Sequence, residues 1–214
     1  MKLKQLLLIF IPAFCLMALI LFIRIVQYEP LYSTPKNQSE NTSEEKSSIP
    51  IFPEDPILGD KKAASNVLIF ADFGCEHCKS DYDIIKELIT QYPKKVKVIW
   101  KGLPVTKFPY NSEPAHRVAF CAQKQGKFEP LADVFFENQT SLSPENIQTF
   151  ATQVGLNQTE LATCVEAADT TSYIQKNKDL ARLLNIQAVP AVFLNNNQIP
   201  TPQSLEEWKT VLSL

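Results

Sequence analysis

Two cysteines separated by two residues are the part of this sequence best suited to chemistry. Cys75 and Cys78 enclose Glu76 and His77. Thiol–disulfide exchange needs an accessible thiolate and a second thiol close enough to close or reopen the ring, and a Cys-x-x-Cys pair at a helix start supplies both. The pattern predicts a redox pair in which Cys75 is the nucleophile and Cys78 the resolving cysteine.

In such a pair, the start of the helix stabilises the thiolate of the first cysteine most. Unpaired backbone N–H groups and the positive end of the helix dipole face it, and both lower its pKa. His77 can stabilise the thiolate further through its charge or a hydrogen bond, whereas the carboxylate of Glu76 disfavours it. A stabilised thiolate favours the dithiol form, so the disulfide form becomes an oxidant. We therefore expect an oxidant.

Other uses of a Cys-x-x-Cys pair fit this chain less well. A structural zinc site needs a second cysteine pair or a nearby histidine pair, whereas Cys121 and Cys164 each stand alone. A c-type haem site needs histidine directly after the second cysteine, where this chain has Lys79. A merely structural disulfide between the two cysteines is the remaining alternative. We expect no metal and no bound cofactor.

The surrounding patterns predict a strand, a helix and a second strand. Residues 66–71 are a short apolar run typical of a buried strand, and residues 75–91 carry apolar side chains at helical spacing. A second strand is predicted over 96–100. The cysteine pair thus lies at the junction between the first strand and the helix, which favours a redox role over a structural one.

The rest of the soluble part continues an α/β pattern. We predict several helices between about 112 and 185, a strand over 191–194, a turn over 195–197, and a last helix capped by Ser204. The prediction is therefore a βαβ half and a ββα half separated by a helical insertion.

The N-terminal segment predicts a membrane anchor over residues 1–27. The uncharged stretch 5–23 would be roughly 28 Å long as a helix, close to the bilayer's hydrocarbon thickness of about 30 Å. A cleaved signal peptide would need a small-x-small site, which is absent here. A lipoprotein signal would need a small residue before Cys15, where Phe14 stands, and a buried core helix would show a polar face. Two lysines before the stretch and one arginine after it favour a cytoplasmic N-terminus.

The composition of the chain indicates the limits of the folded domain and the kind of partner and compartment to expect. Residues 28–56 are polar and predict a flexible linker, which leaves 57–214 as the folded domain. The net charge of −2 argues against nucleic acid as a partner, because phosphate binding needs a basic face. Four cysteines outside the anchor are compatible with two disulfides and an oxidising compartment.

Several segments together resemble the DsbA family of thiol–disulfide oxidoreductases, particularly its thioredoxin domains tethered by an N-terminal anchor. The matching segments occur in the family's order: LGD at 58–60, FADFGCEHCK at 70–79, FCA at 120–122, QGKF at 125–128, GLN at 155–157 and VPAVFLN at 189–195. The resemblance covers about 56–214. It implies a thioredoxin-like α/β fold with an inserted helical subdomain over about 112–185, preceded here by one transmembrane helix.

The resemblance also implies roles outside the pair. It implies that the Val189–Pro190 bond is cis, that this loop packs against the cysteines, and that the backbone of Val189 binds substrate as a short added strand. An ordinary trans proline before a strand is the alternative. It further pairs Cys121 with Cys164 in a structural disulfide worth roughly 3–5 kcal/mol. Two buried free thiols, or a redox-regulatory pair, are the alternatives.

Two positions depart from the family pattern. Many thioredoxin-like proteins place a buried acid six residues before the first cysteine, where this chain has Ile69, and the archetypal oxidase has proline where this chain has Glu76. Asp72, three residues before Cys75, could partly substitute for this acid, but we expect it to stay solvated or to cap the helix. We interpret His116 as a surface residue. Neither histidine has a partner spacing that suggests a metal.

Together these features predict an extracytoplasmic thiol–disulfide oxidoreductase, held by a single-pass membrane anchor with its domain in the periplasm or at the cell surface. It would donate the Cys75–Cys78 disulfide to reduced secreted or membrane proteins. The resemblance implies reoxidation by a membrane redox partner of the DsbB- or VKOR-like kind. The alternatives are a disulfide reductase or isomerase, and a non-catalytic thioredoxin-like adaptor that binds peptides beside Pro190.

Overall fold

The computed structural model describes residues 16–20, 22 and 48–214. The chain forms two compact units, residues 1–45 and 46–214. Residues 16–20 and 22 of the first unit are helical. Within the described ranges, none of the helices has both the length and the apolar character needed to cross a membrane. Most of the anchor predicted for 1–27, with Cys15, and most of the linker predicted for 28–56 lie outside the described residues.

A mixed sheet forms the centre of the larger unit. Its strands are arranged in the order β1-β3-β2-β4-β5, and only β2 and β3 run parallel. The sheet is built from β1 (Ile57–Gly59), β2 (Ser65–Ala71), β3 (Val96–Gly102), β4 (Ala191–Leu194) and β5 (Asn197–Ile199). The predicted strands are all present. Strand β1 was not predicted, and it pairs antiparallel with β3.

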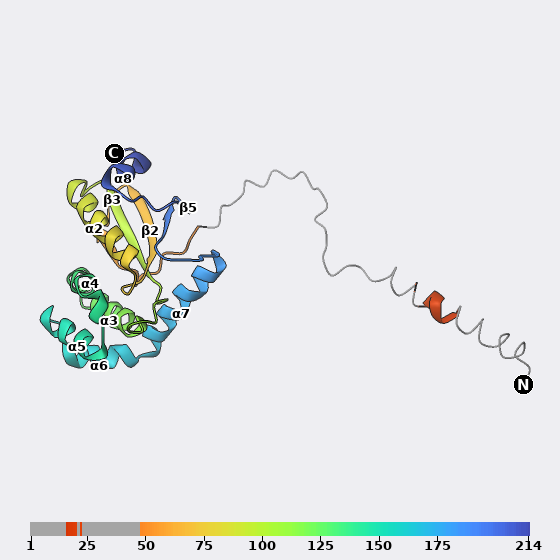
Figure 1. Ribbon diagram of the computed structural model, residues 1–214, viewed down its shortest axis with the longest axis horizontal. Helices are drawn as coiled ribbons and strands as arrows, with labels where there is room; N and C mark the ends of the chain where they lie inside the picture. Colours follow the sequence, from red (N-terminus) through yellow and green to blue (C-terminus); the bar gives the residue numbers. More distant parts are fainter. Residues whose placement is uncertain (1–15, 21, 23–47) are drawn as a thin grey trace, which may run out of the picture. The chain divides into compact units, whose positions relative to one another are not determined.

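The helices around this sheet form two groups, the pair α2 and α8 and the predicted insertion. Helix α2 (Glu76–Gln91) connects the two parallel strands, and α8 (Leu205–Leu212) packs against it. The predicted insertion consists of α3 (Glu113–Lys124), α4 (Phe128–Glu137), a short 3-10 helix (Gln139–Ser141), α5 (Pro144–Gln153), α6 (Gln158–Glu166) and α7 (Ala168–Leu183). Helices α3 to α6 gather at one end of the sheet (Figure 1). The thioredoxin-like α/β fold with inserted helices is therefore confirmed.

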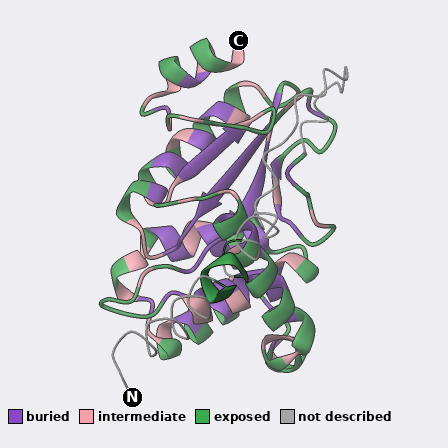
Figure 2. Ribbon diagram, turned by 90° about the vertical axis from the view of Figure 1, so that its right-hand side faces the viewer, coloured by how far each residue is buried: buried purple, intermediate pink, exposed green. Residues whose placement is uncertain are grey.

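Alternation along β2 produces a core on each face of the sheet. Val67 and Ile69 pack into the larger cluster that includes the apolar face of α2, whereas Leu68 and Phe70 pack with Leu180 of α7. Successive side chains of a strand point to opposite faces, so both sets come from one short run. The central strands are buried between helices whose outer faces are exposed (Figure 2). This explains why β2 is apolar throughout.

The folded domain begins earlier than the predicted boundary at residue 57. The side chain of Ile49 is buried, and its backbone N–H donates a hydrogen bond of 3.0 Å to the Asn196 side chain. Asp55, also within the predicted linker, is buried as well. These contacts are made with residues far along the chain, so local composition gave no sign of them.

Asp55 belongs to a buried ion pair that connects residues 48–56, the segment before β1, with the rest of the domain. The ammonium of Lys101 lies 2.5 Å from a carboxylate oxygen of Asp55, and both side chains are 0% exposed. The Tyr173 hydroxyl donates to the other oxygen at 2.9 Å, and the Lys101 ammonium lies 3.7 Å from the ring centre of Phe52. Burial raises the pKa of Asp55 and lowers that of Lys101. The direct contact between the two charges offsets part of the free-energy cost of burying them. Through Asp55, Lys101 and Tyr173 it connects the segment before β1 with β3 and α7.

Candidate active site

The first turn of α2 brings the two cysteines of the pair together. Cys75 is the N-cap residue, with extended backbone angles of φ −98° and ψ 119°. Its sulfur accepts a hydrogen bond from the backbone N–H of Cys78 at 3.3 Å. A side chain at the N-cap can reach the unpaired N–H groups of the first turn, and here a sulfur occupies that position. Both residues are free cysteines in this structure, Cys75 half-buried and Cys78 buried.

The surroundings of the two thiols shift their pKa values in opposite directions. A hydrogen bond from the Cys78 thiol, together with the backbone N–H groups of Cys78 and His77, lowers the pKa of Cys75 to about 7, although burial and the charge of Asp72 act the other way. Burial raises the pKa of Cys78 far above its ordinary value. Cys75 is thus the sulfur that ionises near neutral pH, and Cys78 stays protonated. This difference in pKa suits the roles predicted for them, Cys75 as nucleophile and Cys78 as resolving cysteine.

The loop before β4 lies against the first cysteine. The Cys75 sulfur is 3.6 Å from the Val189 carbonyl oxygen, which accepts its hydrogen bond, and the Val189–Pro190 bond is cis. The register explains the contact, because Ala191 pairs with Phe70 near the end of β2 from which the chain continues to Cys75. Val189 and Pro190 are both half-buried, so one side of the loop stays open to a ligand.

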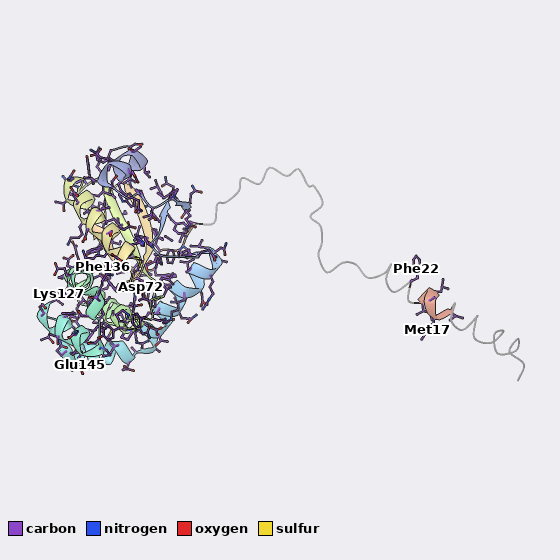
Figure 3. All side chains as sticks on the ribbon, viewed as in Figure 1. Met17, Phe22, Asp72, Lys127, Phe136 and Glu145 are labelled. Carbon is purple, nitrogen blue, oxygen red and sulfur yellow. A yellow bond between two sulfur atoms is a disulfide. The ribbon has the colours of Figure 1, made fainter. Side chains whose placement is uncertain are left out.

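Asp72 is fully buried, and our expectation that it would stay solvated or cap α2 is wrong. It follows β2 directly, at the level where the sheet meets the inserted helices (Figure 3). Its carboxylate accepts hydrogen bonds from the N–H groups of Val105 (2.7 Å), Thr106 (2.6 Å) and Gly74 (3.1 Å), from the Ser112 hydroxyl (2.9 Å), and contacts His116 Nε2 (3.1 Å). Burial raises its pKa, but His116 and these N–H groups lower it well below the ordinary value.

His116 is the partner of Asp72, and it is not the surface residue that we expected. It is only 5% exposed, and its ring lies 4.8 Å from that of Phe73, centre to centre. A Cβ atom on Gly102 would come within 2.5 Å of His116 Nδ1, so the glycine makes room for the ring. One signal could have indicated this burial: His116 lies one turn before Phe120 on the same face of the helix.

The two residues between the cysteines act less directly than predicted. Glu76 and His77 are both exposed, and neither side chain makes a hydrogen bond within residues 48–214. His77 lowers the pKa of Cys75 through its backbone N–H, and the carboxylate that raises this pKa is Asp72. An exposed charge is screened by water, whereas a buried one acts through a medium of lower polarity.

The second cysteine pair lies apart from the first, in the inserted helices. Cys121 of α3 and Cys164 of α6 form a disulfide with an S–S distance of 2.09 Å and a Cα–Cα distance of 5.9 Å. The pairing implied by the resemblance is therefore present in the structure, and it joins the two helices covalently. Within the described ranges no group of three or more His, Cys, Asp or Glu residues is placed to hold a metal ion.

Replacing Asp72 by asparagine is expected to lower the pKa of Cys75 below its value of about 7. The substitution removes the negative charge that opposes the thiolate, while the amide oxygen can still accept the N–H groups of Val105 and Thr106. The measurement is the pH dependence of thiolate absorbance in the reduced protein. Glu76→Gln, which removes an exposed charge from the residue next to Cys75, serves as control and should change this pKa less. A Cys75 pKa that stays unchanged or rises in Asp72→Asn would contradict the assignment.

Comparison with known proteins places these features in context. The family model described as Thioredoxin matches residues 52–213. The chain is 25% identical over 159 residues to the Na(+)/H(+) antiporter NhaA 3 of Salinispora tropica, covering 74% of this chain and 24% of that protein. It thus spans about a quarter of the length of the curated relatives that come first. It is 23% identical over 190 residues to the disulfide bond formation protein D of Bacillus subtilis, covering 82% of this chain and 83% of that protein.

Solved structures agree on the fold. A periplasmic thioredoxin-like protein from Salmonella enterica serovar Typhimurium superposes with a TM-score of 0.67 at 22% identity, covering 82% of this chain and 97% of that chain. At this identity the likeness concerns the arrangement of helices and strands.

Proposed function

This chain belongs to the thioredoxin family, and we propose that it is an extracytoplasmic thiol–disulfide oxidoreductase that works as an oxidase, donating the Cys75–Cys78 disulfide to reduced proteins. The observation that carries the proposal is the stabilised Cys75 thiolate, with a pKa of about 7 against an ordinary 9.0. Only the dithiol form holds this thiolate, so its stabilisation favours reduction of the disulfide and makes that disulfide an oxidant. The advantage is present above about pH 7 and fades as Cys75 takes up a proton below that pH.

The proposed reaction uses both sulfurs in turn. A substrate thiolate attacks the Cys75 sulfur, the Cys75–Cys78 bond breaks, and its electron pair leaves with Cys78. A second substrate thiolate then attacks the substrate sulfur of the mixed disulfide, and Cys75 departs as the stabilised thiolate. The substrate has lost two electrons and gained a disulfide, and the protein is left as a dithiol.

The loop at Pro190 supports the docking of a substrate strand. The carbonyl oxygen of Val189 lies 3.6 Å from the Cys75 sulfur, so an extended peptide pairing with this backbone would bring its own sulfur to Cys75. Backbone pairing is largely independent of side chains. The geometry therefore supports a broad range of reduced secreted or membrane proteins as substrates.

The location outside the cytoplasm rests on two features of the chain. The Cys121–Cys164 disulfide fits an oxidising compartment. The uncharged stretch 5–23 supports an N-terminal anchor, which would keep the domain close to a membrane redox partner of the DsbB- or VKOR-like kind. Reoxidation by such a partner would return the dithiol to the disulfide.

A reductase or isomerase is the second candidate, and Asp72 favours it. The negative charge of Asp72 raises the pKa of Cys75 and so weakens the oxidant. The balance between this charge and the N–H groups of α2 decides how strongly oxidising the pair is.

Thiol trapping in growing cells is expected to find Cys75 and Cys78 mostly as a disulfide. The full chain is alkylated without prior reduction, and the same cells are fractionated to locate the protein in the membrane with its domain outside the cytoplasm. A matched variant with alanine at Cys15, Cys121 and Cys164 ensures that only the active pair is counted. A pair found mostly as dithiol would reject the oxidase in favour of the reductase or isomerase.

A further inference from the structure

Asp81 is a buried acid that the mechanism so far leaves unused. It lies on α2, three residues after Cys78, and is 2% exposed. Its Oδ2 atom is buried without a hydrogen-bond partner, the one ionisable group in this state among the described residues. Buried polar atoms are normally hydrogen-bonded, and an unpaired one lowers stability. A functional role of this carboxyl would explain its presence despite the loss of stability.

The helix places this carboxyl on the same side as the resolving cysteine. Residues three and four apart share a helix face, and the buried face of α2 consists of Cys78, Asp81, Tyr82, Ile85 and Leu88. Asp81 therefore follows Cys78 by one turn, on the side turned toward the core. His77, one turn before Asp81, is exposed and connects this part of the helix with solvent.

The charges around α2 leave Asp81 open to titration near neutral pH. Burial raises its pKa to about 6, and His77 is the charged group that lowers it. Charged groups on neighbouring elements contact other residues: Glu129 and Asp133 of α4 pair with Lys86, Glu206 of α8 with Lys209, and Lys101 of β3 with Asp55. Glu207 of α8 accepts the Gln203 N–H, and Lys97 of β3 donates to the Lys61 carbonyl. Asp81 can thus hold or release a proton in the range where the enzyme would work.

Opening the disulfide creates a demand for a proton at Cys78. The departing Cys78 sulfur would be a buried thiolate, and its raised pKa makes this ion costly. The backbone N–H of Asp72, 3.4 Å away, can donate a hydrogen bond but gives up no proton. The carboxyl of Asp72 is itself held ionised by its five contacts, and residue 69 on β2, six residues before Cys75, is isoleucine.

We propose that Asp81 is the proton donor to Cys78 when the disulfide opens, and the proton acceptor from Cys78 when it closes. The inference rests on the proposed exchange function and deepens it. As the Cys75–Cys78 bond breaks, the electron pair goes to the Cys78 sulfur, which takes the proton of the Asp81 carboxyl directly or through one water molecule. Asp81 becomes a carboxylate and regains a proton from solvent on the side of His77. In the reverse direction the Asp81 carboxylate takes the Cys78 proton as that sulfur attacks.

The relative acidities support this direction of transfer. Cys78 holds a proton far more tightly than Asp81, so the proton moves downhill to the sulfur. The new negative charge on Cys78 raises the pKa of Asp81 further while the thiolate exists, which keeps the donor protonated until transfer.

The test measures how fast dithiothreitol reduces the oxidised full chain at different pH values. The rate constant is divided by the concentration of dithiothreitol thiolate, so that ionisation of the reductant is removed. For the natural protein we expect this normalised rate to fall about tenfold as the pH rises from about 5 to about 8, because the proton donor is lost. In Asp81→Asn the normalised rate should be independent of pH and about tenfold below that of the natural protein at about pH 5.

A matched control and a direct titration separate the proposal from a structural effect. Asp83→Asn removes the same charge two residues away, on the exposed side where Asp83 pairs with Lys79, and should keep the natural profile. Asparagine matches aspartate in shape, so Asp81→Asn should fold. Carboxyl NMR of the reduced natural protein should show Asp81 titrating near about pH 6.

Each outcome decides between the proposals. An Asp81→Asn variant that keeps the natural pH profile, or an Asp81 carboxyl that titrates like one in a short peptide, overturns the role of Asp81 and leaves the exchange function standing. A natural protein whose disulfide does not exchange with thiols overturns both.

Discussion

A Cys78→Ala variant is expected to accumulate covalent adducts with its substrates, whereas Cys75→Ala should form none and lose at least about a thousandfold in exchange rate. Cys75 is half-buried, ionises at about pH 7, and lies beside the Val189 carbonyl oxygen. Cys78 is 1% exposed and stays protonated, so it cannot be reached by a substrate sulfur. Without Cys78, the mixed disulfide on Cys75 lacks the intramolecular thiol that would release it.

Electrophoresis without reducing agent, followed by mass spectrometry of the adducts, measures the trapping. Oxidation of a reduced, unfolded protein by the disulfide form measures the exchange rate. A variant with alanine at both Cys121 and Cys164 is the control, and its Cys75–Cys78 pair should still exchange. A Cys75→Ala protein that keeps its cellular activity would identify the chain as a non-catalytic adaptor that binds peptides beside Pro190.

Replacing Lys101 by methionine is expected to lower the free energy of unfolding by about 3–5 kcal/mol, because it leaves the buried carboxylate of Asp55 without its counter-ion. Both side chains are 0% exposed, so water does not replace the lost contact. The remaining partners of Asp55, the Tyr173 hydroxyl and the Phe52 N–H, are neutral donors. Denaturant unfolding of the full chain, followed by circular dichroism, measures the change.

The pH dependence of this variant provides a second check. Burial raises the pKa of Asp55, and the substitution removes the contact with Lys101 that lowers it. A folded-state pKa above the unfolded value means that the folded protein takes up the proton first as the pH falls. The Lys101→Met protein should therefore regain stability as the pH falls from the folded toward the unfolded pKa of Asp55.

Two further variants isolate the contribution of the ion pair. Lys97→Met, a change at a half-buried lysine of the same strand, should alter stability by no more than about 0.5 kcal/mol. Replacing Asp55 by leucine together with Lys101→Met should recover most of the lost stability, because apolar groups can replace a buried pair. A Lys101→Met protein as stable as the natural one would show that the pair does not hold residues 48–56 against the sheet.

The elements that position the redox pair could be predicted because their signals are local. The apolar run at 66–71, the helical spacing after Cys75 and the strand at 191–194 each depend on residues within one short window. Strand β1 has only three residues, Ile57–Gly59, which is too short for an alternating pattern to show. Its pairing with β3 comes from residues about forty positions away.

The surroundings of the pair could not be predicted, because they are assembled from distant segments. Asp72 contacts residues 33 to 44 positions further along the chain. From the sequence, an aspartate before a helix start is expected to be a cap or a solvated residue. Whether it is buried depends on the loop after β3 and on the start of α3 folding over it. The contact between His116 and Asp72 depends on the same folding, although the position of His116 one turn before Phe120 was a local sign of its burial.

The thiol chemistry follows from the amino-acid sequence alone, because a Cys-x-x-Cys pair between a strand and a helix supplies two thiols and the N–H groups that ionise one of them. How strongly each thiol is ionised depends on tertiary contacts. Acidity depends on burial and on charges within a few ångströms, and folding brings Asp72, whose charge raises the pKa of Cys75, to the pair.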